Sequence, residues 1–334
     1  MLILLRISIS LLTYLYFFRE SFIAELAISF IPYIIWFCIL TVFIEIYLII
    51  HESKRRRKHK SIKIFFIILI TIITIWIWTL YSSEYFWFYN QNDEKVRLEN
   101  KDWISVFYAN ILYKNTDYKS LQQKIEEKNP DIVVLVEFSN DHEYEMKDFF
   151  KKSYPYMNRN SWSSMLAWDV VFSKIPLKNI TETHMVKAWE RNYSYMKILC
   201  DKCKDWIDFY VIHTAAPASL TNFYMRNSQL SKFKSDFTKE QNLWTPTIII
   251  WDFNVSPRSY YYKQLTKNRN MQNILRFQSP NYTWSLLQQW IFRSHIDQLF
   301  ISPEIQISKI KIEDLTGSDH RSFSFNFWIK AINY

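Results

Sequence analysis

The stretch "TPTIIIWDFN" (residues 245–254) predicts a buried strand that ends in polar residues. The run from Thr247 to Ile250 is β-branched throughout, which favours an extended chain. Asp252 and Asn254 follow at once, so the strand end would present a carboxylate and an amide. The indole of Trp251 is unusual there, because chains often place glycine where the backbone turns and a ligand approaches closely.

Similar short apolar runs recur through residues 103–330, separated by polar or helical stretches. They lie at 104–112, 131–138, 165–173, 207–214, 295–302 and 321–328. The segment "TDYKSLQQKIEEKNP" (116–130) has the spacing of an amphipathic helix that stops before Pro130, and a second helix is predicted over 222–240. Strands that alternate with helices predict an α/β fold.

Polar residues able to bind a metal or transfer a proton stand at the ends of these runs. They are Asn110, Glu137, His213, Asp252, Asn254, Asp297, Asp319 and His320. Taken singly, each has an ordinary explanation as a cap, a turn residue or a hydrogen-bonded core histidine. Eight of them in one domain favour a shared site.

The residue types in this set suit phosphate chemistry. Carboxylate and amide oxygens are hard ligands that favour Mg²⁺ or Mn²⁺ over zinc. Two histidines beside carboxylates can transfer protons or stabilise charge on a phosphate. The combination predicts metal-assisted hydrolysis of a phosphodiester or phosphomonoester.

The motifs "YANIL", "LVEF", "VIHT", "DFN", "IDQLF" and "GSDHR", in this order, resemble the endonuclease/exonuclease/phosphatase superfamily. The hydrophobic N-terminus followed by "ANILYKNTDY" is similar to a bacterial membrane-anchored branch of it. The resemblance covers residues 103–330 and implies a four-layer α/β sandwich, two mixed sheets with helices outside and the site at one end of the strands.

The resemblance also implies a role for each site residue. Glu137 would be the main metal ligand, supported by Asn110 and Asp319. Asp252 would activate the attacking water and Asn254 would hold the water or phosphate. His320, oriented by Asp297, would stabilise charge on the scissile phosphate, and His213 would assist phosphate binding or protonate the leaving group. Arg226 and Asn227 match a helix start that often follows the histidine motif, without a clear role.

Residues 1–89 are predicted to form a membrane anchor with two or three transmembrane helices. The apolar stretches 21–50 and 62–82 are long enough to cross a bilayer, and 2–18 is a shorter candidate. The basic loop "HESKRRRKHK" (51–60) between them predicts a cytoplasmic loop, and therefore a multi-pass plasma-membrane protein whose catalytic domain lies outside the cytoplasm. Residues 90–102 form a polar linker.

The composition is abnormal in two residue types. The chain of 334 residues contains 1 Gly and 14 Trp, whereas average glycine usage is about 7%. An aromatic-rich, glycine-poor protein is one explanation. We favour another: many of these tryptophans correspond to UGA codons that the source organism translates as glycine, Trp251 among them.

Several functional alternatives stay open at this point. The substrate would be a phosphate ester, either nucleic acid or a lipid headgroup, and the anchor would contact the lipid bilayer; no protein partner is implied. The alternative of another class is a non-catalytic, membrane-bound binding module. Cys200 and Cys203 fit a local disulfide or two free thiols, and no second ligand pair completes a zinc site.

Overall fold

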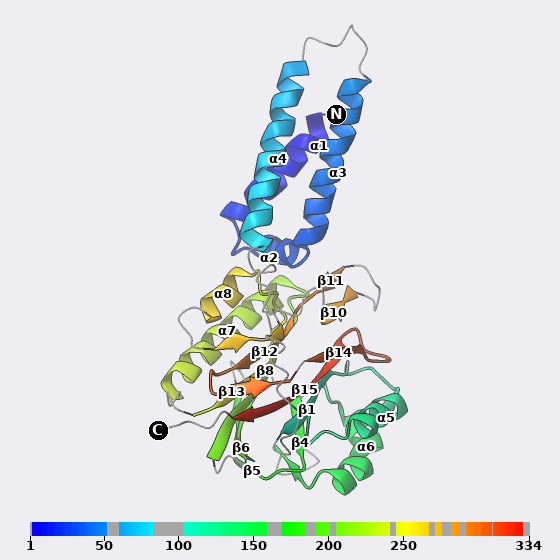
Figure 1. The fold of residues 1–334 in the computed structure, drawn as a ribbon, viewed down its shortest axis with the longest axis vertical. Coiled ribbons are helices and arrows are strands. Elements are labelled where there is room, and N and C mark those ends of the chain that lie inside the picture. Colours follow the sequence, from blue (N-terminus) through cyan, green and yellow to red (C-terminus); the bar gives the residue numbers. More distant parts are fainter. Residues whose placement is uncertain are drawn as a thin grey trace. The chain divides into compact units, whose positions relative to one another are not determined.

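The computed structural model describes residues 2–51, 60–82, 103–158, 169–184, 192–200, 205–240, 245–266, 271–275, 282–286, 292–308 and 310–329. The chain divides into two compact units (Figure 1). One comprises Met1–Phe88 with Arg258–Lys263, and the other comprises Tyr89–Pro257 with Gln264–Tyr334. The predicted linker at 90–102, most of the basic loop at 51–60 and Cys203 lie outside the described residues.

The N-terminal unit is helical. Its helices are α1 (Leu2–Phe17), α2 (Phe22–Ser29), α3 (Ile31–Ile50) and α4 (Lys60–Ser82). The apolar stretch 21–50 forms two helices, α2 and α3, which are separated at Phe30. Pro32 is the second residue of α3; proline disfavours the helical conformation in the residue before it and is tolerated in a first turn, so a new helix begins there.

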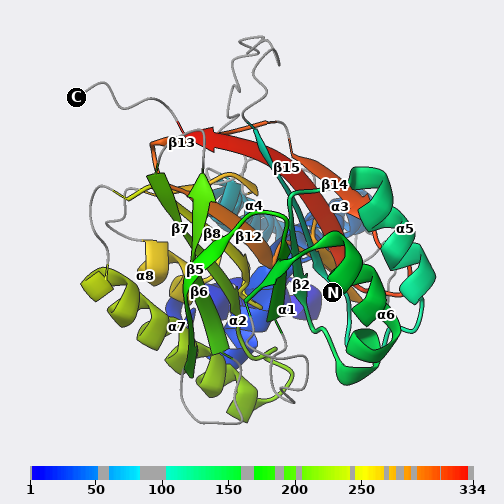
Figure 2. The same cartoon turned by 90° about the horizontal axis from the view of Figure 1, so that it is seen from below.

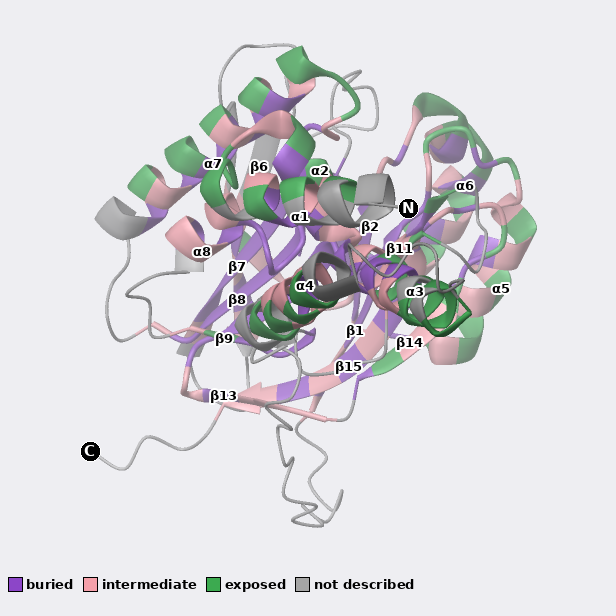
Figure 3. Cartoon of the chain, turned by 90° about the horizontal axis from the view of Figure 1, so that it is seen from above, coloured by how far each residue is buried: buried purple, intermediate pink, exposed green. Residues whose placement is uncertain are grey.

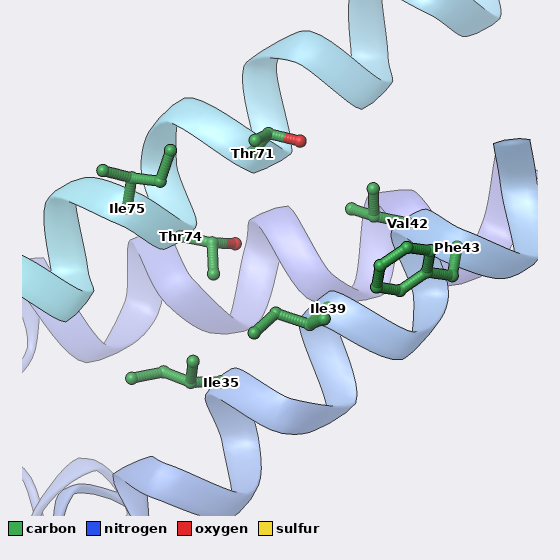
Figure 4. Close-up of a pocket in the computed structure, with 7 residues that line it drawn as sticks. All are labelled: Ile35, Ile39, Val42, Phe43, Thr71, Thr74 and Ile75. Atoms are coloured by element: carbon green, nitrogen blue, oxygen red, sulfur yellow. The ribbon is translucent and has the colours of Figure 1, made fainter.

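One described helix is long and apolar enough to cross a membrane, over Ile31–Leu48 in α3. Within α4, the part searched contains a shorter apolar stretch, Ile64–Trp76. Among the described residues the predicted multi-pass arrangement is therefore not supported. A cavity of about 260 Å³ lies between α3 and α4 (Figure 4), and its lining is apolar apart from Thr71 and Thr74.

The second unit contains two mixed sheets. The seven-stranded sheet has the order β13-β15-β1-β2-β4-β3, with β14 also on β15, and the six-stranded sheet has the order β5-β6-β7-β8-β12-β9. In the first sheet the strands are β1 (Ile104–Asn110), β2 (Ile132–Val136), β3 (Tyr156–Met157), β4 (Asp169–Ser173), β13 (Ile305–Ile307), β14 (Lys311–Asp314) and β15 (Arg321–Ile329). In the second they are β5 (Leu177–His184), β6 (Asn192–Cys200), β7 (Asp205–His213), β8 (Thr247–Asp252), β9 (Gln272–Asn273) and β12 (Asp297–Ile301). The strands β10 (Trp284–Ser285) and β11 (Arg293–Ser294) pair in a separate antiparallel sheet.

Helices cover the outer faces of the two sheets (Figure 2). They are α5 (Tyr118–Lys128) and α6 (Asn140–Ser153) on the first sheet and α7 (Leu220–Glu240) on the second; α8 (Tyr260–Thr266) is short. Leu121 of α5 and Phe150 of α6 are buried in one cluster with Phe107 of β1. Phe233 of α7 packs against Tyr210 of β7, with ring centroids 6.0 Å apart. The predicted α/β sandwich is confirmed.

The main core lies between the sheets and follows the two-residue period of the strands. Val106 and Tyr108 of β1 share it with Val211 of β7 and with Ile248 and Ile250 of β8. Figure 3 shows the strands largely buried while the helices expose one face. This alternation fixes which side chains at the strand ends point inward.

Candidate active site

Strand direction brings the predicted site residues to one edge of the sandwich. β1 and β2 run parallel, with Asn110 opposite Val136, the residue before Glu137. β7 and β8 also run parallel and pair His213 with Asp252. β12 is antiparallel to β8 and pairs Asp297 with that same Asp252. Because parallel strands end at the same edge, the polar residues that terminate them are gathered together.

Asn110 lies at the centre of the group. Its Nδ2 donates to Asp252 Oδ2 at 2.9 Å and lies 3.4 Å from both Glu137 Oε1 and His320 Nε2. Its Oδ1 accepts from the backbone N–H of Leu112 at 3.0 Å. The amide thus links residues from both sheets.

The two histidines approach the carboxylates from different places in the chain, since His213 ends β7 and His320 directly precedes β15. His213 Nε2 lies 3.6 Å from Glu137 Oε1 and 3.7 Å from Asp252 Oδ2. His320 Nε2 lies 3.8 Å from Asp252 Oδ2. Both rings are buried, so either can act on a substrate group where water is scarce.

A hydrogen-bonded chain orients His320. Its Nδ1 lies 2.9 Å from Asp297 Oδ2, and Tyr108 Oη donates to Asp297 Oδ1 at 2.7 Å. Thr283 Oγ1 accepts from the backbone N–H of Asp297 at 3.0 Å. With both carboxylate oxygens engaged, Asp297 holds the imidazole so that Nε2 faces the other site residues.

Burial and charge shift the proton affinities of this group. Burial raises the pKa of Asp252 to about 7 and the charge of Asp297 adds to the rise, while His320, Asn110 and Asn254 oppose it. Burial lowers the pKa of His320, but Asp297 and Asp252 outweigh it and raise the value to about 10. His320 is therefore an imidazolium at neutral pH, and Asp252 can exchange a proton there.

Two residues at the site have positive φ: Glu137 at 63° and Asn254 at 49°. Residues other than glycine rarely adopt a positive φ, and such backbone strain concentrates at functional sites. Asn254 is held by a backbone bond to Asp252 Oδ1 at 3.0 Å and by its Nδ2, which donates to Thr214 O at 2.9 Å. Glu137 Oε2 accepts from the backbone N–H of Tyr113 at 3.1 Å.

Helix α7 supports the ends of β7 and β8. Arg226 is buried, and its Nη1 donates to Asn254 O at 3.0 Å. Gln229 Oε1 accepts from Ala215 N at 2.8 Å. Arg226 Nη2 also donates to Asn227 Oδ1 at 2.8 Å. Arg226 therefore positions Asn254, a role that the sequence did not predict.

Asp319 is placed differently from the other predicted metal ligands. Its Oδ2 accepts from Trp284 Nε1 at 2.8 Å. Its Oδ1 is buried and has no hydrogen-bond partner in the described part of the chain. The preceding Ser318 donates its hydroxyl to Asn110 O at 2.8 Å, which ties this loop to β1.

The donor set fits a hard divalent cation. Asp252, Asp297 and His320 have potential ligand atoms within 4.8 Å of one another, but Asp297 is already engaged by Tyr108 and His320. The carboxylate of Glu137 is partly exposed, at 12%, and Asp319 offers a buried oxygen without a partner. A cation held by the oxygens of Glu137 and Asp319 would offset the negative charge of the site carboxylates.

Sequence reasoning missed Tyr108 and Thr283, both of which fix Asp297. Tyr108 stands two residues before Asn110 on the same face of β1, so a period of two was the signal available for it. Thr283 lies next to Trp284, and nothing local marked it as a partner of a residue 14 positions away.

Comparison with protein families matches residues 107–320 to the Endonuclease/Exonuclease/phosphatase family. None of the curated proteins compared with this chain matches it. D. rerio TDP2 complexed with single strand DNA product is similar in structure, with a TM-score of 0.56 and 15% identity over 68% of this chain and 99% of that one.

Two further solved structures have the same fold. The human Nocturnin catalytic domain with bound sulfate anion gives a TM-score of 0.54 and 19% identity, covering 70% of this chain and 95% of that one. A Bacteroides thetaiotaomicron mannosyl-6-phosphatase gives 0.52 and 14%, covering 68% and 100%. At these identities the likeness concerns the fold alone.

Proposed function

The chain belongs to the endonuclease/exonuclease/phosphatase family of phosphoester hydrolases, and we propose that it hydrolyses phosphodiester bonds in a reaction that depends on Mg²⁺ or Mn²⁺. The observation that carries this proposal is the meeting of Asn110, Glu137, His213, Asp252 and His320, linked by polar contacts of 2.9 to 3.8 Å. A non-catalytic binding module would need no buried histidine and carboxylate of altered pKa at this edge.

Asp252 and His320 would perform the proton and charge work. Asp252, with a pKa of about 7, would accept a proton from the attacking water as its oxygen bonds to phosphorus. His320, kept protonated by Asp297, would face the negative charge that develops on the phosphate oxygens. His213 would bind the phosphate or protonate the leaving oxygen, and Asn254 would hold the water or the phosphate.

Glu137 would hold the metal ion, with Asn110 and Asp319 in support. Bound there, a divalent cation would supply Lewis-acid charge stabilisation to the phosphate. Its charge would also lower the pKa of neighbouring carboxylates. The strained backbone at Glu137 supports this assignment, since the strain is retained where the carboxylate is needed.

A phospholipid or another small phosphate ester is the alternative substrate class. The apolar helix α3, over Ile31–Leu48, supports tethering to a membrane, which would keep the site near lipid headgroups. An extracytoplasmic catalytic unit would require α4 to cross as well. Protease added to intact cells would test this, since a catalytic unit that stays protected lies in the cytoplasm.

We also propose that Trp251 corresponds to a UGA codon translated as glycine in the source organism. The family resemblance favours glycine directly before "DFN", and the chain holds 1 Gly against 14 Trp. Sequencing the gene tests the proposal: TGA is expected at codon 251, and TGG would contradict it.

The activity can be tested on the full chain in detergent micelles, as given and as Trp251→Gly. The substrates are a single-stranded oligonucleotide and bis(p-nitrophenyl) phosphate, each with Mg²⁺, Mn²⁺ or EDTA. We expect metal-dependent hydrolysis that falls by about 10²-fold or more in Glu137→Gln and His320→Ala. Lys152→Gln, in the last turn of α6, is the control and should be unchanged.

The proposal fails if neither chain hydrolyses either substrate. It also fails if both site variants keep full activity, because the assigned residues would then carry no chemistry.

A further inference from the structure

Two arginines rest on one tyrosine ring in the second unit. The guanidinium carbon of Arg293 lies 4.1 Å from the ring centre of Tyr282, and that of Arg321 lies 4.9 Å from it. The two guanidinium carbons are therefore separated by no more than the sum of these distances, about 9 Å. We call Arg293, Tyr282 and Arg321 the arginine pair with its tyrosine.

Backbone bonds place this group beside the catalytic residues. Arg321 directly follows His320, and its backbone N–H donates to Thr283 O at 2.7 Å. Thr283, which follows Tyr282, accepts from the backbone N–H of Asp297 through Oγ1. Trp284 forms an isolated bridge with His320. The backbone that carries Tyr282 and Arg321 therefore adjoins Asp297 and His320, and we call this side of the catalytic edge its wall.

The charge of the group is opposite to that of the site. The site gathers the carboxylates of Glu137, Asp252, Asp297 and Asp319, whereas the wall presents two guanidinium groups. The Arg321 side chain is 20% exposed; its Nη2 donates to Ile312 O at 3.3 Å, and its Nε pairs with Asp314 at 2.8 Å. The Asp314 side chain is 85% exposed, and a pair screened by water in this way is weak, so a stronger anion can replace Asp314 at Arg321.

We propose that the arginine pair with its tyrosine is a subsite for a non-scissile phosphate of a polynucleotide substrate. The inference rests on the proposed function, since it names the substrate of the same site. Guanidinium groups present planar, forked donors that match phosphate oxygens. They would bind the neighbouring phosphate while the catalytic residues hold the one to be cleaved.

A polynucleotide fits this wall better than a single phosphate ester. Every internal phosphodiester of a strand has a neighbouring phosphate, whereas a small diester has none. Basic side chains combined with aromatic rings are typical of grooves that bind single strands. A choline headgroup would instead place its own positive charge against the two guanidinium groups, which is unfavourable.

Binding without turnover tests the subsite separately from catalysis. The probe is a fluorescein-labelled single-stranded octanucleotide added to the full chain in detergent with EDTA, followed by anisotropy between 50 and 300 mM salt. We expect Arg293→Gln and Arg321→Gln each to weaken binding by about tenfold, since a charge-assisted hydrogen bond is lost. The slope of log affinity against log salt should fall by about 0.7 for each variant.

Lys152→Gln is the matched control, because it removes one positive charge at the far end of α6. The helix begins next to Glu137 and rises about 1.5 Å per residue, so Lys152 is remote from the edge. Its octanucleotide affinity should equal that of the parent. Circular dichroism identifies a variant that has unfolded. Arg293→Lys keeps the positive charge and should recover part of the octanucleotide affinity that Arg293→Gln loses.

Each outcome bears on one proposal. Equal affinity in the parent and in the folded double Arg→Gln variant would overturn the subsite even if the enzyme is active. Tighter binding to vesicles containing polyphosphorylated inositol lipid than to the octanucleotide, lost in the same variants, would overturn the polynucleotide assignment. Arginine-dependent octanucleotide binding with no hydrolysis under any metal would leave the subsite standing and refute the proposed function.

Discussion

Replacing Trp251 by glycine is the sharpest test of how this core is built. Trp251 is 1% exposed, and its ring centre lies 3.0 Å from that of Phe253 and 4.6 Å from that of Phe233. Aromatic pairs normally keep about 4.5–7 Å between centroids. The indole N–H is also buried, and no described residue accepts a hydrogen bond from it. Trp251 is not among the residues with positive φ, so the effect of glycine would come from side-chain volume.

The two explanations of Trp251 predict opposite signs. If the core is shaped for glycine, removing the indole relieves overpacking of about 1–3 kcal/mol. It also removes an unpartnered buried donor, worth about another 1–3 kcal/mol. If the core is shaped for tryptophan, the variant loses about 3–5 kcal/mol to a cavity, and glycine inside a strand costs about 0.5–1 kcal/mol more.

We expect Trp251→Gly to raise the free energy of unfolding by about 2 kcal/mol. For a unit of this size that corresponds to a Tm higher by about 4–8 °C. Differential scanning calorimetry of the full chain in detergent measures the shift. Trp284→Gly is the control and should lower Tm, because the Trp284 indole donates to Asp319. A fall in Tm for Trp251→Gly as well would refute the reasoning.

Three further predictions concern the site and its supports. Tyr108→Phe removes the hydroxyl that fixes Asp297, so kcat should fall by about tenfold with little change in KM. An unchanged kcat would show that the hydrogen bond from Tyr108 to Asp297 does not contribute to catalysis. Glu137→Gln should weaken Mn²⁺ binding, measured by calorimetry, by at least about tenfold, and unaltered affinity would move the metal elsewhere. Burial lowers the pKa of His142 from 6.5 to about 4, so the unfolded state binds its proton first as pH falls. The contribution of His142 to the free energy of unfolding should therefore be complete above pH 6.5 and fall by about 1–3 kcal/mol towards pH 4. If burial of His142 is the cause, His142→Gln should flatten that part of the curve of Tm against pH.

Much of the fold follows from periodicity in the sequence. The β-branched run before Trp251 predicted β8, which spans Thr247–Asp252, and the helix that stops before Pro130 was found as α5, capped by Asn129 with φ 44°. Local patterns of this kind are set by neighbouring residues. Hydropathy shows 21–50 as one apolar stretch, whereas the chain ends one helix at Ser29 and begins another at Ile31, beside Pro32.

Long-range contacts could not be predicted in this way. Tyr108 and Asp297 are 189 positions apart, and their hydrogen bond depends on how the two sheets pack. The stacking of Arg293 and Arg321 on Tyr282 depends likewise on where the paired strands β10 and β11 meet the start of β15. No spacing in the sequence encodes either contact.

The phase of the strands separates the site residues into two kinds. His213, Asp252 and Asp297 share the inward phase of their strands, the phase that carries Val211, Ile250 and Leu299 into the core between the sheets. Simple alternation therefore aims their side chains at the site.

Glu137 is the exception, and its backbone explains how it reaches the site. Val136 occupies the inward phase of β2, so a continued strand would turn Glu137 towards the outer helices. The positive φ of 63° ends the strand there instead, and the carboxylate lies 3.4 Å from Asn110 on the inner side. The bond from Tyr113 N to Glu137 Oε2 helps to hold this conformation. An unfavourable backbone at this residue is thus the physical requirement for placing the proposed metal ligand.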